Sequence, residues 1–156
     1  MASFDVEDII DAIDTYLKAN LGTKITAINT EKGDSLLASI SSDAYYRQFV
    51  DSEIPYDPFL IMGIMEPEVT QDIYGESART FKIDVIIYFE AVDATEDYKR
   101  VYRYQKALRE VIQDGYNSIF KRKKISVSGL TPVTVQIAED AQMHRATGVS
   151  LSVTIV

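Results

Sequence analysis

The sequence predicts an α+β fold: a mostly antiparallel β-sheet with two main helices packed on one face, a projecting β-hairpin and a long loop. Residues 80–91 alternate apolar and polar side chains, as a strand with one buried face does. Residues 93–115 then carry apolar side chains at three- and four-residue spacing, as an amphipathic helix does. We therefore expect this strand and this helix to pack in two layers, with the other segments extending the sheet.

The composition predicts one globular domain spanning residues 1–156. Hydrophobic residues make up 46% of the chain and charged residues 26%, which is ordinary for such a domain. No apolar run approaches the ~18 residues of a membrane span, and the first residues carry acids where a signal peptide would carry bases. We therefore expect the protein to stay in the cytosol or in an assembly built there.

Charge and cysteine content argue against several functions. The chain has 24 acidic and 16 basic side chains and a net charge of -8. This balance disfavours a dedicated DNA-binding role, because duplex binding needs several bases to neutralise phosphates. The chain has no cysteine, which excludes disulfides, thiolate metal sites and cysteine nucleophiles.

The N-terminal segment is expected to form an amphipathic helix that ends at Gly22. Acidic residues crowd its first turns, where the helix dipole favours negative charge, and we expect them to be solvated. A short strand over residues 24–29 should follow. The apolar stripe consists of Phe4, Val6, Ile9, Ile10, Ile13, Tyr16 and Leu17, and the acids are Asp5, Glu7, Asp8, Asp11 and Asp14.

The next segments predict a connection and a hairpin. Residues 31–57 are too many for a plain loop, so we expect within them a turn, a strand over residues 35–40 and a short helix capped by Asp43. Residues 58–65 are a nearly continuous apolar run, typical of a strand covered on both faces. Residues 66–79 should then form the long tip of a β-hairpin that leads into the alternating strand.

The second helix has a start and an end signal. Asp93 and Glu96 stand in the capping-box relation, and Gly115 should end the helix in the left-handed conformation. Two further strands are expected, one over residues 125–137 that breaks or bends at Pro132, and one over residues 149–155. The helical stripe that should face the sheet is Tyr98, Val101, Tyr102, Gln105, Leu108, Val111 and Ile112.

A search for catalytic or metal-binding motifs finds none, and we expect a protein that is not an enzyme and needs no cofactor or metal. The chain lacks H-E-x-x-H, G-x-S-x-G and a Gly-rich phosphate loop. The single histidine, His144, is expected to be a surface or interface residue. Asp84 would be a metal ligand only if partners converged on it, and pairing with a base on a neighbouring strand is the expected alternative.

Aromatic and basic side chains in the predicted connections are candidates for an interface. Aromatic rings with a polar group are enriched at protein interfaces, although these rings would also serve to cover the edges of the domain's own core. A basic run after the second helix forms either a solvated rim or a contact with an acidic partner. The candidate interface residues are Tyr45, Tyr46, Phe49, Val69, Ile73, Tyr74, Lys121, Arg122, Lys123 and Lys124.

The order of these elements resembles the tail terminator, or tail completion, proteins of tailed bacteriophages. The likeness covers most of the chain beyond Asp57. It consists of a leading helix, an apolar strand entered through Pro58, a long hairpin, the alternating strand over residues 80–89, a helix ending in residues 107–112, and two last strands. The resemblance implies a virion protein without cofactor, assembled in the host cytoplasm.

The resemblance also implies partners. Such proteins form a hexameric ring on the finished tail tube, stop its polymerisation and offer the surface to which the head docks. The expected partners are therefore other copies of this chain, the tail tube protein, the head–tail connector protein and the sheath protein, with DNA passing through the ring. Two alternatives stay open at this point: another ring protein of the neck or tail tube, and a small metal-dependent enzyme.

Overall fold

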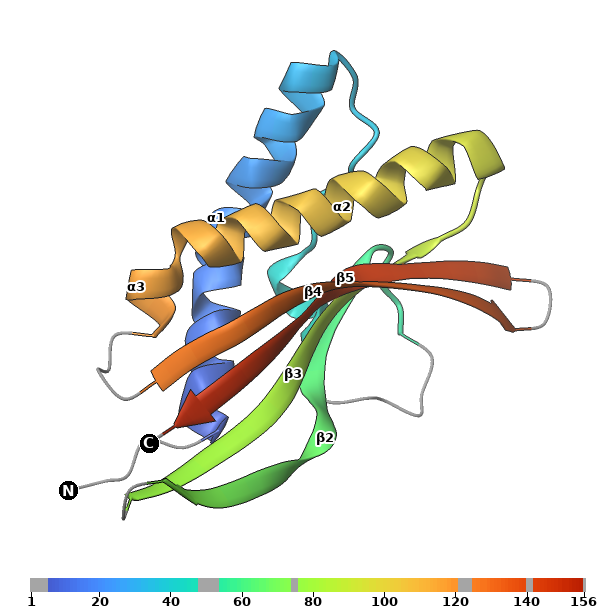
Figure 1. Cartoon of the computed structure of the whole chain (residues 1–156). Helices are drawn as coiled ribbons and strands as arrows, with labels where there is room; N and C mark the ends of the chain where they lie inside the picture. Colours follow the sequence, from blue (N-terminus) through green and yellow to red (C-terminus); the bar gives the residue numbers. More distant parts are fainter. Residues whose placement is uncertain (1–5, 48–53, 74–75, 121–124, 140–141, 156) are drawn as a thin grey trace.

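The computed structural model describes residues 6–47, 54–73, 76–120, 125–139 and 142–155. Three helices, one 3₁₀ helix and five strands are found in these ranges (Figure 1). In chain order they are α1 (Val6–Lys32), η1 (Ser42–Ala44), β1 (Tyr45–Tyr46), β2 (Phe59–Ile73), β3 (Glu76–Glu90), α2 (Ala94–Asp114), α3 (Tyr116–Ile119), β4 (Ile125–Glu139) and β5 (Gln142–Ile155).

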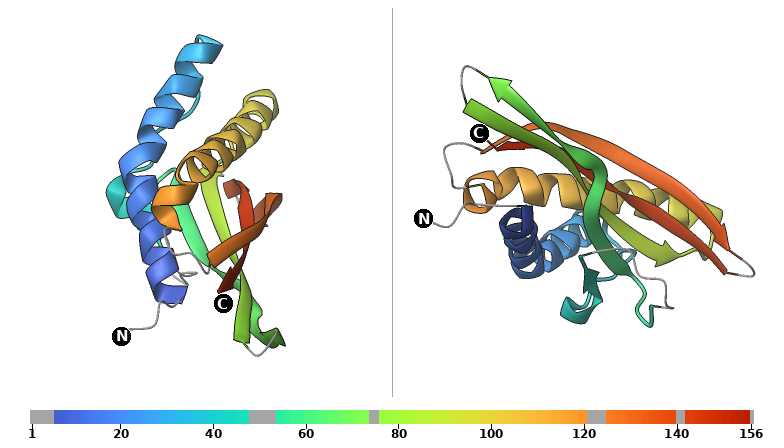
Figure 2. Two further views of the ribbon diagram at one scale, coloured as in Figure 1. Left: turned by 60° about the vertical axis from the view of Figure 1, so that its left-hand side comes forward. Right: turned by 90° about the horizontal axis from the view of Figure 1, so that it is seen from below.

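The strands form one mixed sheet in the order β1-β2-β3-β5-β4. β1 runs parallel to β2, and the other neighbouring strands are antiparallel. Helices α1 and α2 cross each other on one face of this sheet (Figures 1 and 2). The expected α+β architecture, mostly antiparallel and with two main helices on one face, is confirmed.

The main core lies between the helices and the sheet. The alternation of β3 places its apolar residues on the helix side, where none is more than 2% exposed. Helix α2 contributes Leu108 and α1 contributes Leu17 and Leu21, all fully buried. The β3 residues in this core are Phe81, Ile83, Val85, Ile87 and Phe89.

A second, smaller cluster covers part of the opposite face. Ile61, Ile86, Tyr88 and Ala146 are buried there. Phe59 stacks on Tyr88 with ring centroids 5.1 Å apart. The prediction that β2 begins as a strand covered on both faces is therefore confirmed, because neighbouring residues of β2 contribute to both clusters.

Helix α1 is longer than the sequence suggested, so the expected end at Gly22 and the expected strand over residues 24–29 are wrong. The apolar period continues through Leu21, Ile25 and Ile28, all buried, while Gly22 lies on the exposed face and interrupts no packing. The helix ends at Gly33 instead, which has a φ of +72°. There the N–H groups of Gly33 and Asp34 donate back to the helix, as in a Schellman motif.

The segment after α1 also differs from expectation. Residues 35–40 are not a strand, because the side-chain amide of Asn29 bonds both backbone groups of Leu37, at 3.0 Å and 2.8 Å. Asp43 does not cap a helix; the Ser41 hydroxyl accepts its N–H before a single 3₁₀ turn. Tyr45 and Tyr46 then pair with β2. Because the backbone of these two residues is extended, their rings lie on opposite faces of the sheet.

The expected β2–β3 hairpin forms, but residues 66–79 are mainly ladder and not a long tip. Pairing continues to Ile73↔Glu76, with register shifts between Ile64 and Val69. A ladder satisfies backbone donors and acceptors within the chain, which an open loop would leave to solvent.

The last two strands are also longer than expected. β4 runs through Pro132, which an edge strand tolerates because only one of its sides belongs to a ladder. Its irregularity lies between Val127 and Gly129 instead. β5 begins at Gln142 rather than near residue 149, and its Gly148 packs against β3 so closely that a Cβ would lie 2.8 Å from the Ile86 Cα.

Helix α2 begins with the expected Asp93 cap, whose carboxylate accepts the Thr95 N–H at 2.7 Å. The second half of the expected capping box is wrong, because the described Glu96 side chain makes no bond back to the Asp93 N–H. Gly115 ends α2 with a φ of −88°, so the expected left-handed conformation is wrong. The Tyr16 ring on α1 lies close to this glycine, because a Cβ here would lie 2.8 Å from Tyr16 Cδ1 and would require the ring to move. The predicted stripe is also partly wrong, since Tyr98 and Tyr102 are exposed.

Candidate interaction surfaces

The structure divides the predicted interface residues into three groups. Tyr45 and Tyr46 lie in β1 and are half-buried against the chain's own clusters. Val69 and Ile73 lie in the distal part of β2, opposite Thr80 and Glu76. The remaining candidates lie outside the described residues: Phe49, Tyr74, Lys121, Arg122, Lys123 and Lys124.

Strand β1 is held to α1 by charged and aromatic contacts. Arg47 forms ion pairs with Asp11 and Asp14, and Lys18 pairs with Asp14 at 2.9 Å. Lys18 also lies 5.6 Å from the centre of the Tyr45 ring. Burial, with a smaller effect of the Asp14 charge, raises the pKa of Tyr45 to about 12.

Asp14 corrects one expectation about the acidic turns of α1. It is 3% exposed and therefore does not belong to a solvated face, whereas Glu7 and Asp8 are exposed as expected. Periodicity places Asp14 next to Ile13 on the buried side, and the charges of Lys18 and Arg47 compensate the burial of its carboxylate. Tyr45 and Asp14 thus serve to attach the β1 segment.

The β2–β3 hairpin projects beyond the end of β5. β3 and β5 pair from Glu90↔His144 only as far as Arg79↔Ile155, whereas β2 and β3 continue to Ile73↔Glu76. Figure 1 shows this two-stranded arm at one end of the sheet and the paired ends of β4 and β5, Glu139 and Gln142, at the other.

Among the residues that the structure describes, the sheet has two free edges of different kinds. One is β4, whose described residues pair with β5 on a single side. The other is the outer side of β2 beyond Ile61, since β1 covers only Leu60 and Ile61. Free edges present unpaired N–H and C=O groups, which are templates for pairing with another chain.

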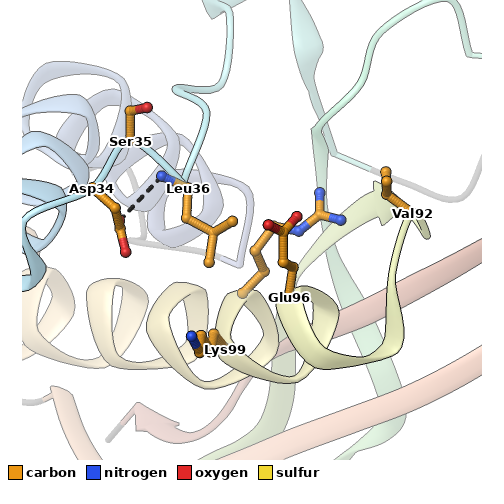
Figure 3. A pocket seen from close by; sticks show the side chains of 7 residues that line it. Asp34, Ser35, Leu36, Val92, Glu96 and Lys99 are labelled. Carbon is orange, nitrogen blue, oxygen red and sulfur yellow. Dashed lines mark hydrogen bonds between the residues drawn. The ribbon is translucent and has the colours of Figure 1, made fainter.

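A shallow groove lies between α2 and the segment that follows α1. One half, with a volume of about 400 Å³, is lined by the residues drawn in Figure 3. Asp34 accepts hydrogen bonds from Arg103, at 2.8 Å and 3.0 Å, and from the Leu36 N–H at 3.2 Å. These bonds, the Arg103 bond first, hold the pKa of Asp34 below its usual range. The lining is Asp34, Ser35, Leu36, Val92, Glu96, Lys99 and Arg100.

The other half of the groove is basic and aromatic. It has a volume of about 290 Å³ and is reached past Lys99, which lines both halves. Tyr98 and Tyr102 are 64% and 58% exposed and meet edge to face, 5.2 Å apart. The lining of this half is Ile28, Lys32, Tyr98, Lys99, Tyr102, Arg103 and Lys106. This surface is not predicted by the sequence, because Tyr98 and Tyr102 continue the helical stripe that was expected to face the sheet.

A buried ion cluster fixes the start of α2 to β5. Asp97, 1% exposed, accepts the Arg145 Nε–H at 3.1 Å and the Val92 N–H at 3.3 Å, and it also bonds Arg100. Burial raises the pKa of Asp97, but the bonds from Arg145, Val92 and Arg100 outweigh this effect and leave the pKa below its usual value. Because three donors occupy this carboxylate, we assign it to positioning α2.

The remaining candidates for chemistry are also accounted for by local structure. His144 is half-buried in β5, and its ring lies 6.4 Å from that of Phe59. Gly63 and Ser150 stand opposite Asp84, so the expected cross-strand basic partner is not there. Within the described part of the chain, no three histidine or acidic side chains gather as a metal site would require.

No protein-family model matches this chain, and no curated protein matches it significantly. Of the helices described, none has the length and apolar character needed to cross a membrane. The fold and its surfaces therefore define a class only: an α+β protein with an open sheet, two projecting hairpins and a groove on its helical side.

Proposed function

We propose that this chain is a structural ring protein of the tail terminator type of tailed bacteriophages. In this role it caps the finished tail tube, stops its polymerisation and provides the surface for head docking. The observation that supports the proposal most directly is the sheet with two unlike free edges, β4 and the distal part of β2. It is a binding function that requires no catalytic centre.

Unlike edges suit a closed ring. In a ring each subunit presents one surface to the neighbour on one side and a different surface to the neighbour on the other. The β4 edge and the projecting β2–β3 arm lie on different sides of the sheet's centre, which is β3. They therefore supply two surfaces of the kind a head-to-tail contact uses.

The net charge agrees with DNA passing through such a ring. A lumen lined with bases would hold phosphates by releasing their counterions, whereas a chain with a net charge of -8 repels them on average. We propose homo-hexamers that contact the tail tube protein on one side and the head–tail connector on the other, in virions assembled in the host cytoplasm.

Light scattering and negative-stain electron microscopy of the purified protein test the proposal. We expect rings with the mass of six 17.6 kDa chains. The second candidate is a neck or tube protein, which the same open edges favour. A tube protein would stack into long tubes, whereas a terminator would remain a single ring. A monomer that binds a divalent metal stoichiometrically would instead support the enzyme alternative.

The arm provides a second test. We expect Ile73→Ser with Tyr74→Ala to leave the circular dichroism spectrum unchanged and to weaken ring formation or capping, giving tails of uncontrolled length. Truncating well-buried interface anchors costs ~2 kcal/mol or more of binding. The matched control, Gln71→Ala with Asp72→Ala, changes polar residues of the same strand end. A double variant that melts earlier yet still caps tubes would show that these anchors pack on their own subunit.

A further inference from the structure

The basic half of the helical groove has a composition unlike the rest of the molecule. Four bases, Lys32, Lys99, Arg103 and Lys106, surround Tyr98 and Tyr102 on a chain whose net charge is -8. Both rings are more than half exposed. Exposed aromatic rings beside bases are typical of a surface that receives an acidic partner with some apolar area.

The charges of this groove are only partly matched within the subunit. Arg103 is paired with Asp34 at 2.8 Å, and Lys106 lies 3.7 Å from Glu31. By contrast, no carboxylate among the residues described forms an ion pair with Lys32 or Lys99, and both are exposed. Two ammonium groups are thus left to attract an acidic segment.

The opposite end of α1 carries the complementary chemistry. Glu7 and Asp8 are exposed in its first turn. Val6 and Ile10 beside them pack against the main core but are only partly buried, so each also leaves some apolar surface exposed. The first turn of α1 is therefore acidic and aliphatic where the groove is basic and aromatic.

A single chain cannot bring these two surfaces together. Ile28 and Lys32 of the groove lie at the end of α1, and a helix of 27 residues separates its ends by about 40 Å at 1.5 Å per residue. Figure 2 shows α1 extended along one side of the molecule, with its start far from the first half of α2. The contact can form only between copies, and it joins two different surfaces.

We infer that the groove of one subunit receives the first turn of α1 from a second copy of this chain. Lys32 and Lys99 bind Glu7 and Asp8 of the neighbour, while Tyr98 and Tyr102 cover its Val6 and Ile10. The contact is heterologous and repeats around a ring, so the inference rests on the proposed ring and assigns one of its interfaces.

Charge reversal tests the contact. The groove variant is Lys32→Glu with Lys99→Glu, and the helix-start variant is Glu7→Lys with Asp8→Lys. Each alone should associate about tenfold or more weakly than the wild type, because like charges then face each other. Mixed in equal amounts they should form rings of alternating subunits, since each groove then meets a helix start of opposite charge.

The control is Arg109→Glu, which shifts the net charge in the same direction at an exposed position outside the groove. It should form rings as the wild type does. Thermal melts confirm that each variant is folded, and Lys32→Gln with Lys99→Gln replaces the groove variant if reversal prevents folding. Salt should weaken the wild-type contact, because charges at the surface are screened beyond about 8 Å at physiological ionic strength.

Two results would overturn the inferred contact, and only one of them would also overturn the proposed ring. If the wild type forms rings and both reversed variants do so equally well, the ring stands and this interface is wrong. If the wild type remains monomeric at every concentration, the proposed ring and this interface fail together.

Discussion

The two faces of α2 carry the same residue types and have different roles. On the inner face Tyr104 is 1% exposed, its hydroxyl donates to the Ala38 carbonyl at 2.8 Å, and its ring packs 5.5 Å from that of Phe89. On the outer face Tyr98 and Tyr102 are exposed and meet each other edge to face. Burial, and not residue type, decides which tyrosine stabilises the fold and which remains open for binding.

Acidic residues at the start of α2 repeat this contrast. Asp97 faces inward and is enclosed by Arg100, Arg145 and the Val92 N–H. Glu96, its neighbour in sequence, faces outward and lines the groove. A step of one residue turns a side chain by about 100° around a helix, so adjacent carboxylates acquire different partners.

The largest effect is expected from the apolar core of the inner face. Leu108→Ala should lower the free energy of unfolding by ~2 to 5 kcal/mol, through lost transfer energy and an unfilled cavity. Denaturant melts measure this change. A loss below about 0.5 kcal/mol would mean that α2 does not pack on the sheet through this face.

Asp97→Asn tests the charged part of the inner face. We expect a loss of about 2 kcal/mol at neutral pH, as is typical for hydrogen bonds to a buried charged group. Because the pKa of Asp97 is lower in the folded chain, its contribution is present above the unfolded pKa of about 3.9 and is lost as pH falls through the folded pKa.

The pH dependence and a matched variant sharpen that test. The difference between wild type and Asp97→Asn should shrink below about pH 4, as urea melts at several pH values would show. Glu96→Gln on the outer face should leave the free energy of unfolding almost unchanged. Equal losses from both variants would contradict the contrast between the two faces.

Tyr104→Phe removes one hydroxyl from the inner face. The expected loss is about 1 kcal/mol at neutral pH, the usual contribution of one hydrogen bond. Burial raises the pKa of Tyr104 to about 12. The hydroxyl's contribution is therefore full below the unfolded pKa of about 10 and is lost as pH rises towards 12, so melts above pH 10 should bring variant and wild type together.

The smallest effect on stability is expected from the outer face. Tyr98→Ala and Tyr102→Ala should each change the free energy of unfolding by no more than about 0.5 kcal/mol. If our inference is right, the same variants weaken association of the subunits. A large loss of stability in chemical melts would mean that the rings support the fold and that the groove is not free for a partner.

Alternation and helical period predicted most of this fold. The strand over residues 80–91, the Asp93 cap and the α2 core around Leu108 were all readable because each depends on neighbours close in sequence. Gly22 misled the prediction because glycine on an exposed helical face costs only about 1 kcal/mol, which the packing of Leu21 and Ile25 outweighs. The strand predicted over residues 35–40 is a loop, because the side-chain amide of Asn29 bonds the Leu37 N–H and C=O in place of a neighbouring strand.

The residues of the groove were harder to predict from the sequence than those of the β2–β3 arm. Val69 and Ile73 stood out as apolar residues among polar ones. Tyr98 and Tyr102 instead continued the helical stripe of apolar residues that was expected to face the sheet. The buried face of α2 is the one that carries Asp97, Val101 and Tyr104, and the packing of α1 across α2 determines it. A signal existed in the bases that flank the tyrosines, Lys99, Arg103 and Lys106, because bases so close to a stripe indicate its solvated border.

By itself the sequence determined which segments alternate and which recur at helical spacing, and with them the α+β class and the apolar face of β3, because these follow from local backbone geometry. Tertiary structure alone decided where α1 ends, which face of α2 is buried, why Gly148 must lack a side chain, why Gly115 lies against the Tyr16 ring, and which carboxylates are buried. Those features depend on the distance between elements remote in the chain, such as Tyr16 against Gly115 and Ile86 against Gly148. No local periodicity encodes that distance, since it is set by how the helices and strands close around a shared core.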